Sequence, residues 1–219
     1  MHESLSQVEV PERGRVSVRR VGPEPGRGPV LILAHGAGSD MNEPLLCHVQ
    51  KAVAARGIAC LTFNFPYKEQ GRKPPDRAPV LEATWRAVIG ACGGEAGRLF
   101  IGGKSMGGRM ASHLAAQGVA CAGLVLLGYP LHPARKPERL RVDHFPAIRC
   151  PSLFIQGTRD PLCELERLEP ALNTLGAPAT LHRIEGGDHS FKVLKRLNRS
   201  EEAVRAEIVD TIVAWIESR

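Results

Sequence analysis

A serine flanked by glycines is the feature of this chain with the most direct chemical meaning. The sequence GKSMG, residues 103–107, follows directly after the apolar residues 99–102. Glycines two positions before and two positions after a serine permit a sharp strand-to-helix turn that exposes the serine hydroxyl. We therefore predict that Ser105 is a nucleophile. Serine is also a common helix N-cap, but an N-cap does not need glycine on both sides.

A nucleophilic serine needs a base to take its proton, and His189 is the histidine best placed for this task. It lies in the sequence IEGGDHSF, residues 184–191, directly after an expected strand. The glycines of this segment can bring an imidazole over the serine. His35 lies in the HGAG loop, and His48, His132 and His144 do not follow a strand end as closely. A histidine in a surface loop without a catalytic role is the alternative interpretation.

An acid is expected to orient the imidazole, and Asp160 at the end of the apolar sequence SLFIQGTRD is our candidate. Asp188 is the neighbour of His189 in sequence and is poorly placed to reach Nδ1 of that ring. The expected strand at residues 123–127 is followed by Gly-Tyr-Pro, which contains no acid. A solvated turn aspartate before Pro161 remains the alternative.

Two backbone amides are expected to stabilise the oxyanion of a tetrahedral intermediate. One is the N–H of Met106, at the start of a helix whose dipole adds a favourable field. The other is the N–H of Ala37 in the sequence HGAG, residues 35–38, where the glycines let the loop turn its amides toward the site. By itself this motif also fits an ordinary tight turn.

The elements that must position these residues alternate between apolar strands and helical periodicity. This pattern predicts an α/β fold with a mostly parallel sheet, covered by helices on both faces and with its reactive groups at the carboxyl edge. We expect one domain over residues 1–219, with the longest irregular segment at residues 129–148. The expected strands are residues 16–21 (an edge strand), 29–34, 58–65, 99–103, 123–127, 150–156 and 179–184, and the expected helices are residues 44–56, 81–92, 106–117 and 201–218.

Composition excludes several other classes of protein. Hydrophobic residues make up 43% of the chain and charged residues 24%, which is ordinary for a globular domain. Residues 1–15 lack the apolar core of a signal peptide, and no run is long enough to cross a bilayer. The six cysteines have no CxxC or metal spacing, so we expect reduced thiols and a cytoplasmic location.

The same reasoning limits the partners. The net charge of +6 is dispersed and is not interleaved with aromatic residues, so we expect no nucleic acid. Histidines and carboxylates do not cluster with ligand spacing, so we expect no metal and no cofactor. The sequence leaves the oligomeric state open.

Together, these motifs resemble the α/β-hydrolase superfamily over nearly the whole chain, from residue 29 to the last helix. The sequences LAHGAGSD, FNFPY, GGKSMGGR and GGDHSF are most similar to a small lidless group near the dienelactone hydrolases, which includes testis-expressed hydrolase-like proteins and bacterial relatives. The resemblance implies the α/β-hydrolase fold and a serine triad in the order Ser105, Asp160, His189. Dienelactone hydrolases proper carry a cysteine where this chain has Ser105.

The resemblance also implies an open site. Related lipases and epoxide hydrolases insert a cap after the strand that corresponds to residues 123–127, and here the insert is at most residues 129–148. An open site favours small or protruding acyl groups. We expect Tyr67, Tyr129 and Phe191 to contact the substrate, with Phe65 and Leu131 as further wall candidates, although core packing suits the phenylalanines equally. Arg135, Lys136 and Arg139 are candidates for attracting an anionic substrate.

These features predict a serine hydrolase that cleaves a carboxylic ester or thioester of a small molecule through an acyl-enzyme. A non-catalytic binding or scaffold protein on the same fold is the alternative interpretation. A peptidase is a third possibility, although peptidases of this kind usually carry an additional domain that restricts access.

Overall fold

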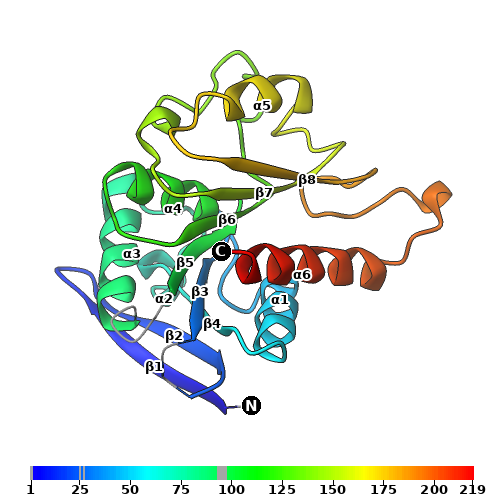
Figure 1. The fold of residues 1–219 in the computed structure, drawn as a ribbon. Coiled ribbons are helices and arrows are strands. Elements are labelled where there is room, and N and C mark those ends of the chain that lie inside the picture. Colours follow the sequence, from blue (N-terminus) through cyan, green and yellow to red (C-terminus); the bar gives the residue numbers. More distant parts are fainter. Residues whose placement is uncertain (1, 25, 27, 93–97) are drawn as a thin grey trace.

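The computed structural model describes residues 2–24, 26, 28–92 and 98–219, and an eight-stranded sheet runs through its centre (Figure 1). The strands are β1 (His2–Val10), β2 (Gly14–Gly22), β3 (Pro29–Ala34), β4 (Ala59–Phe63), β5 (Arg98–Lys104), β6 (Gly123–Leu127), β7 (Ser152–Gly157) and β8 (Ala179–Ile184). The helices are α1 (Pro44–Ala54), α2 (Pro66–Glu69), α3 (Ala78–Cys92), α4 (Met106–Ala116), α5 (Leu165–Leu172) and α6 (Glu201–Glu217), with 3-10 helices η1 (Phe145–Ala147) and η2 (Lys195–Leu197).

The sheet is mostly parallel. Its strand order is β1-β2-β4-β3-β5-β6-β7-β8, and every pair from β4 to β8 is parallel. Among the described strands, β1 with β2 and β2 with β4 pair in the antiparallel sense. Helices α1 and α6 lie on one face and α3 and α4 on the other (Figure 1). This confirms the predicted α/β-hydrolase fold.

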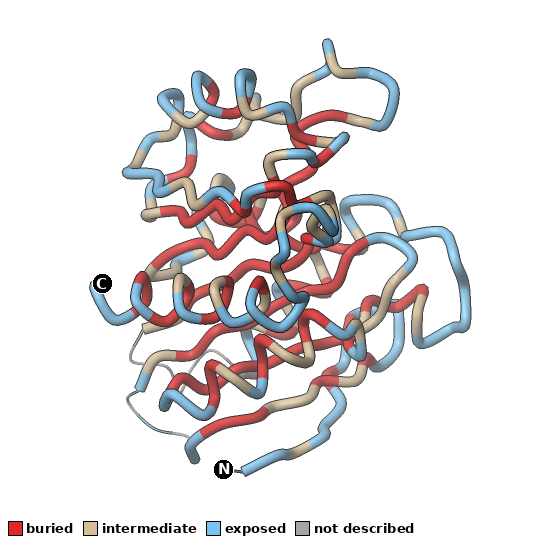
Figure 2. The backbone as a smooth tube through the Cα atoms, turned by 90° about the vertical axis from the view of Figure 1, so that its right-hand side faces the viewer, coloured by how far each residue is buried: buried red, intermediate tan, exposed pale blue. Residues whose placement is uncertain are grey.

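The sheet is buried on both faces because each central strand sends alternate side chains into two separate cores. In β3, Leu31 and Leu33 belong to the core cluster that contains residues of α1 and α6. Val30 and Ile32 belong to the cluster that contains residues of α3 and α4. Figure 2 shows buried residues along the strands and inner helix faces, whereas the N-terminal strand is mostly exposed.

One prediction about the sheet is wrong. The strand at residues 16–21 is not an edge strand, because β1 pairs with β2 along its whole length, from His2 opposite Gly22 to Val10 opposite Gly14. Within β1 only Val8 and Val10 are buried, so its sequence HESLSQVEV has no apolar run to reveal it. The short helix α2, the two 3-10 helices and α5 were also not predicted, although the sequence of α5 is amphipathic.

Two further features bear on the class of protein. None of the described helices combines the length and the apolar character that a bilayer crossing requires. Cys60 and Cys163 are buried free thiols, as expected for small core residues, whereas Cys47, Cys121 and Cys150 are partly exposed free thiols. The side chain of Cys92 lies outside the described part of the chain.

Candidate active site

Ser105 occupies a sharp turn between β5 and α4. Its φ of 50° and ψ of −115° are unusual for a residue with a side chain. The turn brings the backbone close to β3: a Cβ atom on Gly103 would lie 2.2 Å from the Ala34 carbonyl oxygen, and one on Gly107 would lie 2.3 Å from it. Both glycines are therefore required by close packing, and the turn has the form of a nucleophile elbow.

Three side chains that are distant in sequence meet at the carboxyl edge of the sheet. His189 Nε2 lies 2.9 Å from Ser105 Oγ, and His189 Nδ1 lies 2.7 Å from Asp160 Oδ2. The serine follows β5, the aspartate follows β7 and the histidine follows β8, as expected for parallel strands that end at one edge. The structure therefore brings together the three residues that were selected from the sequence.

The carboxylate of Asp160 is enclosed and fully hydrogen-bonded. Its side chain has no exposed surface, and besides the His189 ring it accepts the Gln156 side-chain amide at 2.6 Å and the Leu162 backbone N–H at 2.8 Å. Because a carboxylate only accepts, His189 Nδ1 carries the hydrogen and Nε2 is left to accept from the serine hydroxyl. Gln156 was missed in the sequence; the available signal was a polar residue in an otherwise apolar buried strand.

The two amides expected to form an oxyanion hole lie near Ser105. Ala37, Ser105 and Met106 line the same cavity. Neither the Ala37 nor the Met106 amide donates a backbone hydrogen bond in the described part of the chain. A free N–H at the start of α4 also benefits from the helix dipole. Both amides therefore have the hydrogen-bonding capacity that an oxyanion requires.

His35 holds the loop that carries the Ala37 amide. The Phe65 backbone N–H donates to His35 Nε2 at 3.3 Å, so the ring hydrogen is on Nδ1, which donates to the Gly36 carbonyl at 2.8 Å. Burial lowers the pKa of His35 to about 4, which keeps the ring neutral near neutral pH. The fixed tautomer ties the turn after β3 to the end of β4.

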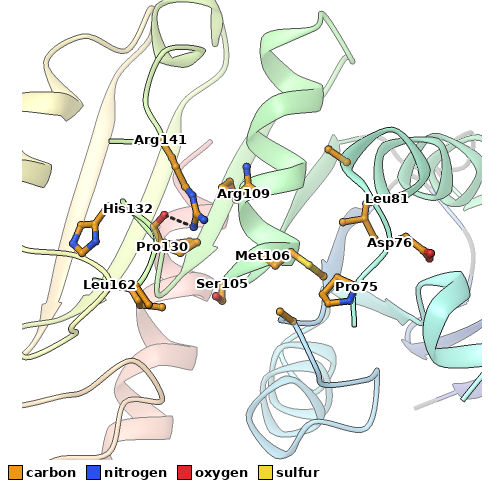
Figure 3. Close-up of a pocket in the computed structure, with 13 residues that line it drawn as sticks. Pro75, Asp76, Leu81, Ser105, Met106, Arg109, Pro130, His132, Arg141 and Leu162 are labelled. Atoms are coloured by element: carbon orange, nitrogen blue, oxygen red, sulfur yellow. Dashed lines mark hydrogen bonds between the residues drawn. The ribbon is translucent and has the colours of Figure 1, made fainter. Parts of the chain in front are cut away.

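A cavity of about 380 Å³ opens beside Ser105. In Figure 3, Ser105 lies between one wall that contains Pro130, His132, Arg141 and Leu162 and a second wall that contains Met106, Pro75, Asp76 and Leu81. Arg109, one turn after Ser105 on α4, also lines the cavity. In the described part of the chain, no three His, Cys, Asp or Glu side chains are grouped in a way that could bind a metal ion.

The aromatic residues expected to contact the substrate do not line this cavity. Tyr67, Tyr129 and Phe191 are 0%, 1% and 3% exposed and belong to the two cores, as do Phe65 and Leu131. They support the site from behind: the Tyr129 hydroxyl donates to the Arg141 carbonyl at 2.7 Å, and the Phe191 ring lies 5.6 Å from the Lys104 ammonium. Burying these aromatic rings in a core removes more apolar surface from water, and is therefore more favourable, than placing them in a short surface loop.

The cations nearest the site also differ from those expected. Arg135, Lys136 and Arg139 are exposed and are not among the residues that line the cavity, whereas Arg141 and Arg109 are. The sequence contained a usable signal for Arg109, because a residue four positions after Ser105 lies on the same face of the helix. No comparable local pattern marks Arg141, which lies in an irregular loop.

Comparison with known proteins assigns the family. A family model described as an alpha/beta hydrolase domain matches residues 27–217. The chain belongs to the α/β-hydrolase family. Within this α/β hydrolase, the connection from β6 to β7 is described throughout and contains only η1, which agrees with the expected lack of a cap.

Solved structures share this architecture at low sequence identity. A dienelactone hydrolase from Anabaena variabilis superposes with a TM-score of 0.77 at 21% identity, covering 99% of this chain and 97% of that one. A serine hydrolase without a lid from Xanthomonas campestris gives 0.71 at 20% identity, covering 98% and 95%. An esterase domain from Rhodothermus marinus gives 0.73 at 16% identity, covering 98% of both chains. At these identities the likeness concerns the fold.

Proposed function

We propose that this α/β hydrolase is a serine hydrolase that cleaves a carboxylic ester or thioester of a small molecule. The observation that carries the proposal is the unbroken hydrogen-bond series from Asp160 through the His189 ring to the Ser105 hydroxyl. The elbow conformation of Ser105 and the serine hydrolases and esterases among the similar structures support it further. We also propose that residues 1–219 act as one domain.

In the first half of the reaction, Ser105 Oγ attacks the substrate carbonyl while His189 Nε2 takes the hydroxyl proton. Asp160 stabilises the imidazolium that forms. The negative charge that develops on the carbonyl oxygen is stabilised by the Ala37 and Met106 amides, each of which is typically worth about a hundredfold or more in rate. The imidazolium then protonates the departing alcohol or thiol, which leaves an ester between the acyl group and Ser105.

In the second half, a water molecule attacks the acyl-enzyme. His189 removes a proton from this water, and the second tetrahedral oxyanion accepts hydrogen bonds from the same two amides. Collapse of the intermediate releases the carboxylic acid and returns the proton from His189 to Ser105 Oγ. The modest cavity volume and the short connection after β6 favour small acyl groups over long lipid chains.

A fluorophosphonate probe tests the proposal, because it reacts covalently with an activated serine much faster than with an ordinary one. We expect the wild-type protein to be labelled and Ser105→Ala to lose labelling completely. Ser190→Ala is the matched control, since Ser190 is an exposed serine next to His189 and should leave labelling intact.

Hydrolysis of 4-nitrophenyl esters of increasing acyl length then defines the acyl preference. We expect short esters to be hydrolysed faster than long ones, and Ser105→Ala to abolish the activity. A folded wild-type protein with neither labelling nor hydrolysis would instead support a non-catalytic binding role.

A further inference from the structure

Two arginine side chains line the cavity beside Ser105, and neither pairs with a carboxylate in the described part of the chain. Arg109 reaches the cavity from α4, and Arg141 reaches it from the connection between β6 and β7 (Figure 3). Arg141 Nη1 donates to the Pro130 carbonyl at 3.5 Å, and Arg109 Nη1 lies 3.4 Å from His113 Nε2. Arg109 Nε is buried and has no hydrogen-bond partner among the described residues.

Two other partly buried arginines have a carboxylate partner, whereas Arg20, which lines a separate cavity, also has a buried Nε without a partner among the described residues. Arg19 pairs with Glu3 and Arg199 pairs with Glu207, although both side chains keep some exposure. Among the described residues lining the cavity, the one carboxylate is Asp76, and it is already engaged by Arg72 at 2.6 Å and by the Tyr67 backbone N–H at 3.0 Å. Among the described residues, neither Arg109 nor Arg141 forms an ion pair with a carboxylate.

Both electrostatics and burial make this arrangement costly in the absence of a ligand. Partial burial lowers the pKa of Arg141, and the neighbouring charge of Arg109 lowers it further. Two like charges that are partly removed from water repel each other and lose hydration. An anion between the two arginines would offset both their repulsion and their lost hydration. A carboxylate suits this position because its two oxygens match the geometry of a guanidinium group.

The rest of the cavity surface indicates what should join this anion to the reacting carbonyl. Pro75, Ala78, Leu81, Met106 and Leu162 provide mainly carbon atoms around Ser105. Such a surface suits methylene groups, and the volume of about 380 Å³ suits a short chain. A charge at one end and a scissile carbonyl at the other would be held by different parts of the same cavity.

We propose that Arg109 and Arg141 form a subsite for a carboxylate that lies a short aliphatic chain away from the scissile carbonyl. The preferred substrate class is then the monoester or monothioester of a short dicarboxylic acid. The inference rests on the proposed function, since it assigns the acyl group of the same reaction. Anchoring the distal carboxylate orients the ester carbonyl toward Ser105 and the oxyanion amides.

The kinetic test compares 4-nitrophenyl hydrogen adipate with 4-nitrophenyl hexanoate, which have the same acyl length and differ in the terminal carboxylate. We expect the wild-type kcat/KM to favour the adipate ester by at least about tenfold, the size of a good charge-assisted contact. Arg141→Met and Arg109→Met should each lower this ratio by about tenfold, and Arg141→Lys should retain part of it.

Arg139→Met is the matched control, because Arg139 is an exposed arginine on the same connection and does not line the cavity. We expect this variant to keep the wild-type ratio. Circular dichroism establishes that each variant is folded, and the Arg141→Lys variant carries the decision should a methionine variant fail to fold. The subsite proposal is wrong if the folded Arg109 and Arg141 variants keep the wild-type ratio of kcat/KM for the two esters. It is also wrong if the wild-type protein does not prefer the adipate ester.

A binding measurement separates the subsite from the proposed function. Isothermal titration calorimetry on the Ser105→Ala protein should detect adipate more strongly than hexanoate, and Arg141→Met in that background should remove the difference. If adipate binds in a way that depends on Arg141 but the wild-type protein hydrolyses no ester, the subsite proposal stands and the proposed hydrolase function is wrong. If the protein hydrolyses esters without selectivity for adipate and does not bind adipate, the proposed function stands and the subsite proposal is wrong.

Discussion

The group of Ser105, His189 and Asp160 lies next to the cavity-lining arginines Arg109 and Arg141, but the two groups differ in how many of their polar atoms have hydrogen-bond partners. Around Asp160, each carboxylate oxygen accepts hydrogen bonds, and the His189 ring is engaged at both nitrogens. Arg109 and Arg141 have no carboxylate partner in the described part of the chain. The Asp160 carboxylate and the His189 ring find partners within the protein, although Gln156 Oε1 beside them has none among the described residues, whereas the two guanidinium groups leave positive charge open to a ligand.

The largest effect is expected from Asp160→Asn, which tests the hydrogen-bond series from Asp160 through His189 to Ser105. An asparagine amide can donate toward Nδ1 and thereby favour the wrong tautomer of His189, so we expect kcat to fall by about 10³–10⁴-fold. Steady-state hydrolysis of a short 4-nitrophenyl ester measures the effect. Asp188→Asn is the control, because Asp188 Oδ1 accepts the backbone amides of Ser190 and Lys192 rather than the imidazole. A wild-type rate in Asp160→Asn would exclude the acid role.

A second test concerns the packing that holds the serine in place. In Gly107→Ala, the added methyl group would lie 2.3 Å from the Ala34 carbonyl oxygen and 2.7 Å from that of His35. We expect the free energy of unfolding to fall by about 3 kcal/mol or more, because two backbone segments must move apart.

Urea denaturation measures this loss, and Gly90→Ala provides the comparison. Gly90 lies in α3 and no described atom beyond the backbone of its own helix would lie within 4 Å of an added Cβ atom, so alanine there should raise the free energy of unfolding by about 0.5–1 kcal/mol. If both alanine variants had the same stability, the close approach of β3 to the elbow would not be the reason for glycine at residue 107.

The smallest effect is expected from the cations outside the cavity. Replacing Arg135, Lys136 and Arg139 together by serine should change kcat/KM for the adipate ester by less than about threefold, because exposed charges act through a screened field. The difference from wild type should vanish in about 0.5 M NaCl. A large, salt-resistant loss would instead move the anion site from the cavity wall to this loop.

The sequence was most informative where function depends on local geometry. The glycines around Ser105 mark the turn in the sequence, although the contact that requires them is with β3, and His189 and Asp160 follow strands whose apolar runs are visible in the sequence. The fold followed from the same runs, and β6 was predicted with its observed bounds. Such features could be predicted because each depends on a few consecutive residues.

The polar strand β1 and the walls of the cavity could not be predicted in this way. The sequence of β1 is mostly polar, with only the short alternation at residues 7–10 typical of a strand, and its pairing with β2 became visible only in the structure. Tyr67, Tyr129 and Phe191 follow strand ends like the triad residues, yet their rings are buried in the cores. A position after a strand does not decide whether a side chain points into the cavity or into the core.

For this α/β hydrolase, the sequence alone determined the fold class, the turn at Ser105 and the identity of the acid and base candidates. Tertiary structure decided which side chains surround the serine and which charges remain without partners. The physical reason is that strand and turn preferences act between neighbours in sequence, whereas burial and charge compensation depend on groups brought together from distant segments. Arg109 and Arg141 could not be identified as a pair from the sequence, because only the tertiary structure places both of them on the same cavity.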